Sequence, residues 1–146
     1  MRLLLLSLLW THPSQAVSLA LPRAEICRLS TLVVTGEVTG LEARWSEPRP
    51  GEIETRADIA VDRVLKGATP EQGLVVVTPG GTLGDLLQRV EDAARLREDR
   101  RYLLLLAPVP GGWAPVGGED GAILLEGPQG DGEDEATALA GLVGCL

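Results

Sequence analysis

The sequence predicts a mainly β protein, a small curved barrel of five to six strands with short flanking helices. Residues 51–67 place apolar or small side chains at every second position, which is the period of a strand with one buried face. At about 3.3 Å per residue this strand would exceed ~40 Å if it were straight. A small domain accommodates such a strand when the sheet coils, so we expect a barrel.

The start of the chain is typical of a secretory signal peptide. Arg2 precedes an apolar run over residues 3–10, and a Ser-Gln-Ala sequence ending at Ala16 supplies small residues for cleavage. We predict cleavage after Ala16, with Ala20 as the second choice, and a secreted protein, periplasmic or extracellular. The apolar run is about half the length needed to span a bilayer, so no membrane span is expected.

The rest of the chain is predicted to form one barrel domain, residues 17–126, followed by an acidic flexible tail, residues 127–146, with a short C-terminal helix. The net charge is −8, and removing the signal peptide removes one arginine and no acid. Nucleic acid is therefore not an expected partner, because binding it depends on cationic contacts to phosphates.

The elements of the first half follow from turn residues and periodicity. Residues 22–31 begin with Pro22, which suits a first helical turn, and predict a short helix carrying Cys27. Residues 32–45 form a long strand whose inward-facing parity changes near Gly40, which predicts a β-bulge there. The two prolines of residues 46–51 predict a turn before the second long strand.

The second half contains shorter strands. Residues 74–78 and 102–107 are apolar runs of the kind found in a sheet interior, and residues 113–116 and 122–125 predict a final hairpin. Residues 82–101 leave two alternatives open. Their leucines fit helical spacing, and Glu, Arg and Ala favour a helix, whereas residues 87–90 also suit a short strand.

The chain contains two cysteines, Cys27 and Cys145. In an oxidising compartment a pair in a small exported domain predicts a disulfide, here joining the two ends of the domain. The alternative is a disordered tail in which Cys145 stays unpaired or joins another chain.

Residue types limit the chemistry of the secreted chain. The single histidine, His12, lies within the predicted signal peptide, so a Ser-His-Asp triad, a Cys-His dyad and His-ligated zinc are excluded after cleavage. The acidic residues of the tail do not have the spacing of a calcium loop, and we interpret them as a solvated charge run: Asp131, Glu133, Asp134 and Glu135. No catalytic residue, cofactor or metal is predicted.

Four carboxylates alternate with the apolar residues of the second long strand: Glu52, Glu54, Asp58 and Asp62. We interpret them as the solvated face of the strand. The alternative is a glycosidase-like pair of carboxylates, which would require one raised pKa.

A surface for a partner is the remaining candidate site, and it consists of Trp45, Arg95, Arg97, Arg100 and Arg101. The arginines alternate with Glu98 and Asp99, so local pairing is expected to occupy most of them. We interpret Trp45 and Trp113 as side chains that fill the core or its rim, rather than as surfaces on which a ligand would stack.

Several segments carry a resemblance, in this order: GEVTGLEARW, IETRADIAVDRVLKG, VVVTPGG, RRYLLLLAP and GWAPVGGEDGAI. Together they resemble a family of bacterial secreted domains with an OB-like barrel of the netrin or metalloproteinase-inhibitor type, over residues 24–126. The resemblance implies an OB-like topology and an extended rather than helical conformation for residues 86–96. Animal inhibitors of this class chelate the protease zinc through a cysteine at the mature N-terminus. The predicted start here is Val17, so that mechanism is not implied.

The leading functional hypothesis is a secreted noncatalytic binding module, protein-binding or inhibitor-like, with an unidentified protein partner. Two alternatives come from other classes: a carboxylate-dependent hydrolase and a structural component of the envelope.

Overall fold

The computed structural model describes residues 20–146. The predicted signal peptide and its cleavage site after Ala16 lie outside this part. None of the helices within residues 20–146 has the length and hydropathy needed to cross a bilayer.

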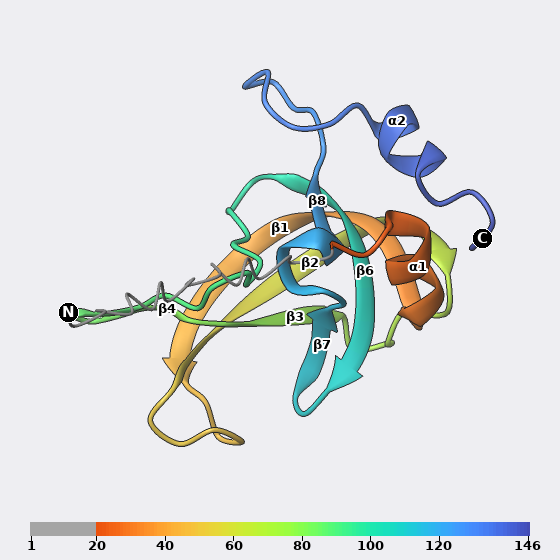
Figure 1. The fold of residues 1–146 in the computed structure, drawn as a ribbon. Helices are drawn as coiled ribbons and strands as arrows, with labels where there is room; N and C mark the ends of the chain where they lie inside the picture. Colours follow the sequence, from red (N-terminus) through yellow and green to blue (C-terminus); the bar gives the residue numbers. More distant parts are fainter. Residues whose placement is uncertain (1–19) are drawn as a thin grey trace, which may run out of the picture.

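The fold is mainly β, as predicted, and its main sheet closes into a curved barrel (Figure 1). β1 hydrogen-bonds to β2 on one edge and to β6 on the other. The strand order β1-β2-β3-β7-β6 therefore closes back on β1. All barrel pairings are antiparallel except β3 with β7, which is the arrangement of an OB-like barrel. The barrel strands are β1 (Leu32–Trp45), β2 (Ile53–Lys66), β3 (Leu74–Pro79), β6 (Arg101–Val109) and β7 (Gly112–Pro115).

The two long strands bend where the sequence indicated. The β1–β2 register shifts between Val38 and Gly40, which confirms the predicted bulge, and again between Thr35 and Gly36. A Cβ atom at Gly36 would lie 2.7 Å from the carbonyl oxygen of Ala60. Glycine is therefore required where β1 passes close to β2, and the bulges give the sheet the curvature that closes it.

The predicted pairing of residues 113–116 with residues 122–125 in a final hairpin is wrong. β7 and β8 (Ala122–Leu124) do not pair with each other; both pair with β6, on the edge that β1 leaves open. A 3₁₀ turn, η1 (Gly118–Gly121), separates β7 from β8 along the chain. Gly118 has φ of 63°, and a Cβ there would collide with the carbonyl oxygen of Asp92, so η1 packs directly on the preceding loop.

Residues 82–101 contain no helix, so the helical alternative is wrong and the extended one is confirmed. They form a two-stranded sheet, β4 (Gly81–Leu83) with β5 (Leu86–Gln88), followed by turns. Two features explain why propensity is overridden. Gly84 has φ of 60° at the hairpin turn, and Leu96 is buried against the barrel interior. Packing of the following loop on the barrel therefore outweighs the helical preference of the segment.

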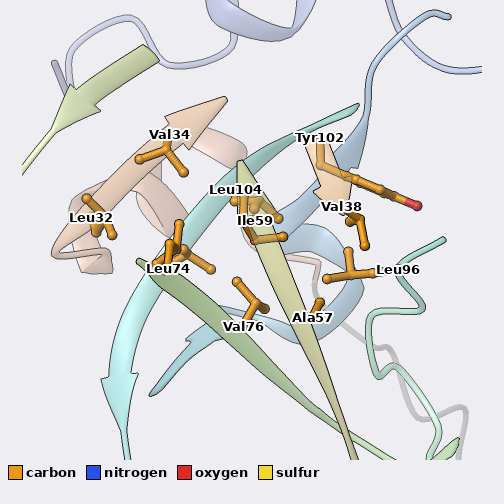
Figure 2. Packing of buried hydrophobic residues seen from close by; sticks show 11 residues of the cluster. Leu32, Val34, Val38, Ala57, Ile59, Leu74, Val76, Leu96, Tyr102 and Leu104 are labelled. Atoms are coloured by element: carbon orange, nitrogen blue, oxygen red, sulfur yellow. The ribbon is translucent and has the colours of Figure 1, made fainter. Parts of the chain in front are cut away.

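The barrel interior is filled by alternate side chains of several strands. Figure 2 shows them pointing into one shared space, with Leu104 and Ile59 near its middle and Tyr102 and Leu96 on one side. The hydroxyl of Tyr102 accepts a hydrogen bond from the backbone N–H of Arg97 at 2.9 Å, so its polar end is satisfied.

A second core covers the outside of β6. Leu103 and Leu105 alternate with the barrel residues and pack beneath α1 (Arg23–Leu29) and the tail, including Ala138 of α2 (Glu135–Ala140). Both predicted short helices are thus present. Cys27 on α1 is bonded to Cys145 near the chain end, with Cα atoms 5.9 Å apart. The predicted disulfide therefore holds the tail against α1.

Candidate binding groove

A groove of about 430 Å³, open to solvent, lies between the β1–β2 ribbon and the segment that contains β4 and β5. This end of the molecule is opposite the two helices in Figure 1. The groove floor comes from Leu41 and Ala43 of β1 and Thr55 of β2. The wall comes from the end of β3, from the β4–β5 hairpin and from the loop that follows: Thr78 to Thr82, Leu87 to Val90 and Ala93 to Leu96.

The wall is attached to the ribbon by several hydrogen bonds. The backbone N–H of Gly80 donates to the carbonyl oxygen of Ile53 at 2.7 Å, and the N–H of Ile53 donates to Gln88 Oε1 at 2.5 Å. Thr55 Oγ1 donates to the carbonyl oxygen of Gly80 at 2.8 Å. The groove is therefore formed before any ligand arrives.

Large apolar side chains are exposed at the groove. Leu41 leaves 38% of its surface exposed and Leu87 leaves 60%, although both line it. Trp45 follows two residues after Ala43 on the same strand face and is 51% exposed. Leu86, which precedes Leu87 on β5, is 54% exposed but does not line the groove. Apolar surface gathered at a concave site is typical of a ligand-binding region.

Within the described part of the chain, the charged residues that line the groove are Arg89 and Arg95, and no carboxylate lines it. Three threonine hydroxyls line it: Thr55, Thr78 and Thr82. Among residues 20–146, no imidazole or carboxylate lines the groove beside them. In residues 20–146, no three His, Cys, Asp or Glu side chains form a group suited to a metal ion. The described lining therefore offers a ligand apolar surface, threonine side chains and two guanidinium groups.

The predicted solvated face of β2 is wrong at one position. Glu54 is 2% exposed, and its side chain accepts a hydrogen bond from Arg44 Nε at 2.8 Å. This bond raises the pKa of Arg44. Burial occurs because β2 lies between β1 and β3, so that Arg44 and Pro79 flank Glu54 on the outer face.

The other carboxylates of this row have separate surroundings. Glu52 pairs with Arg49 at 3.1 Å and Asp62 with Arg101 at 2.9 Å, while Asp58 is exposed. The four acids do not converge on one site.

The residues of the predicted partner surface are divided between two places. Arg95 lines the groove, and Trp45 lies on β1 two residues after the lining residue Ala43. Arg97 and Arg100 instead both pair with Asp131 in the tail. Arg101 pairs with Asp62 and with Glu135. The expected local pairing with Glu98 and Asp99 is wrong, because the arginines reach carboxylates distant in sequence. Trp113 packs against the barrel core.

The acids of the tail are partly exposed, as a solvated charge run implies, but they are also paired, which the sequence did not predict. Glu133 binds Arg23 through two hydrogen bonds of 2.9 and 3.0 Å. Asp134 is the N-cap of α2 and accepts the backbone N–H of Thr137 at 3.0 Å. Folding brings Arg23 of α1 to Glu133 and Arg101 of β6 to Glu135, a proximity that sequence spacing does not reveal.

These pairs predict a pH dependence of stability. The hydrogen bond from Arg100 lowers the pKa of Asp131, and that from Arg23 lowers the pKa of Glu133. A carboxyl group with a lowered folded pKa stabilises the fold fully above its unfolded pKa, and this contribution is lost as the pH falls through the folded pKa. The protein should therefore lose stability below about pH 4.

The check is urea unfolding of the Asp131→Asn/Glu133→Gln variant at neutral and acidic pH. We expect this variant to be less stable than the wild type at neutral pH, with a difference that shrinks as the pH falls below about 4. Asp85→Asn, at an exposed position without an ion pair in the described part of the chain, is the control and should show no such change. A pH-independent difference for the double variant would contradict this role.

Sequence reasoning missed Leu41, Leu87 and Arg89 as groove residues. The one available signal was the conflict between helical and extended patterns in residues 82–101, because this ambiguous segment supplies most of the wall.

The sequence matches no protein-family model, and no solved structure matches the chain. The resemblance to secreted netrin-type domains therefore stays a prediction.

Proposed function

We propose that this protein is a secreted, noncatalytic binding module that holds a segment of a protein partner in the groove. The observation that carries the proposal is the exposure of Leu41 and Leu87 within a preformed concave site. Covering a leucine side chain contributes about 1.5–3 kcal/mol when it is fully buried, so these residues supply affinity once a partner covers them.

Two further features support this function. The closed barrel holds the groove on a rigid scaffold, which lowers the entropy lost on binding, and the Cys27–Cys145 disulfide ties the two ends of the domain together at its opposite end. A disulfide is also stable in an oxidising compartment, which fits export of the chain. An inhibitor-like role, as the netrin-type resemblance implies, is one form that such binding would take.

The test compares capture of partners by the wild type and by the Leu41→Ser/Leu87→Ser variant, using the secreted fraction of the producing cell. We expect the variant to bind its main partner at least about tenfold more weakly, because two apolar contacts are lost. Val143→Ser is the matched control. Val143 is 79% exposed and lies in the tail, away from the groove, so its replacement should leave capture unchanged.

Equal capture by the groove variant and the control would contradict the proposal. So would turnover of glycosides, peptides or phosphoesters by the purified protein, with loss of that activity in Asp58→Asn or Glu54→Gln. That second result would instead support the carboxylate hydrolase hypothesis.

A further inference from the structure

We infer that the occupant of the groove is an extended peptide segment that combines apolar side chains with carboxylates, and that Arg89 and Arg95 contact these carboxylates. This inference rests on the proposed function and specifies the partner chemistry.

The first argument is the pairing state of the arginines. Among residues 20–146, every arginine except Arg89 and Arg95 donates a side-chain hydrogen bond or takes part in an ion pair. The paired set is Arg23, Arg28, Arg44, Arg49, Arg56, Arg63, Arg97, Arg100 and Arg101. The two without a partner in this part of the chain both line the groove.

The second argument is charge complementarity. The chain carries a net charge of −8, yet the two charged residues of the described part that line the groove are both cationic. Guanidinium groups bind carboxylates in a bidentate geometry, and unpaired arginines beside an apolar surface favour a ligand with both properties. A basic segment would meet repulsion from both arginines.

The third argument concerns the free edge of β1. β6 pairs with β1 only from Leu32 to Glu37, and no described strand pairs with the outer edge of β1 from Thr39 to Trp45. Leu41 and Ala43 belong to this edge and line the groove. An extended peptide would add backbone hydrogen bonds to the edge while alternate side chains enter the groove.

A peptide explains these features better than other anions do. Nucleic acid binding needs several cationic contacts to phosphates, and an overall negative chain opposes it. The groove is also lined largely by apolar and threonine side chains, which suit a peptide rather than a sugar–phosphate backbone.

The experiment probes the purified protein with an array of random short peptides. We expect the bound peptides to be enriched in Asp and Glu alternating with Leu, Val or Ile. In solution, the best of them should bind about tenfold tighter than its counterpart with glutamine at each acidic position, as expected for two partly exposed ion pairs. Raising the salt concentration to about 1 M should remove the preference.

Arg89→Gln/Arg95→Gln should abolish the acidic preference while retaining binding of the glutamine peptide. Arg28→Gln/Arg63→Gln removes the same charge from exposed ion pairs elsewhere and should keep the preference. Thermal unfolding of both double variants verifies that each is folded.

The outcomes separate this inference from the proposed function. Bound peptides that are neutral or basic, with binding still dependent on Leu41 and Leu87, overturn the inference and leave the binding function in place. Single-stranded DNA that binds as tightly as the acidic peptide, with the same dependence on Arg89 and Arg95, also overturns it. Loss of the leucine dependence contradicts the proposed function itself.

Discussion

Replacing Cys27 and Cys145 together by alanine is expected to lower the free energy of unfolding by about 4–5 kcal/mol. The two residues are 118 positions apart, so their bond closes almost the entire described chain into one loop. Closing a loop of this length restricts the unfolded chain, and opening it restores the entropy that the bond removed. Urea unfolding of the double variant and of the wild type without reductant measures the difference.

Reduced wild-type protein serves as the control and should unfold at nearly the same urea concentration as the double variant. Intact mass after alkylation verifies the bond independently, because label should enter at both cysteines only after reduction. Alkylation of the untreated protein would contradict the disulfide, and an unchanged unfolding midpoint in the variant would contradict its stabilising role.

Leu104→Ala is expected to destabilise the protein by about 3 kcal/mol, within the range for removing a buried leucine side chain. Leu104 is fully buried and lies beside Val34 of β1 in the barrel interior (Figure 2). Truncation loses its transfer free energy and leaves a cavity that strands fixed by their hydrogen bonds cannot close. Urea unfolding at neutral pH gives the difference from the wild type.

Leu87→Ala is the matched control, because Leu87 is 60% exposed and its truncation should cost no more than about 0.5 kcal/mol. Leu105→Ala tests the second core on the outer side of β6 and should resemble Leu104→Ala. Equal effects of Leu104→Ala and Leu87→Ala would contradict a packed barrel interior.

The candidate site was only partly predictable from sequence. Arg95 and Trp45 were singled out, and they lie in or next to the groove, but Leu41 and Leu87 look like ordinary strand or helix residues in the sequence. Their importance comes from exposure, which depends on what packs over them. Burial of Glu54 depends likewise on its neighbours in β1 and β3.

The sequence by itself determined the long strands, the bulge at Gly40, the short helices and the cysteine pair. Each of these depends on local conformational preference, on side-chain periodicity or on composition, which can be evaluated along the chain. Tertiary structure alone decided that residues 82–101 form a short hairpin and a loop rather than a helix, that β7 and β8 both pair with β6, and that the tail carboxylates bind distant arginines. These outcomes depend on contacts between residues far apart in sequence, which form only when the barrel closes.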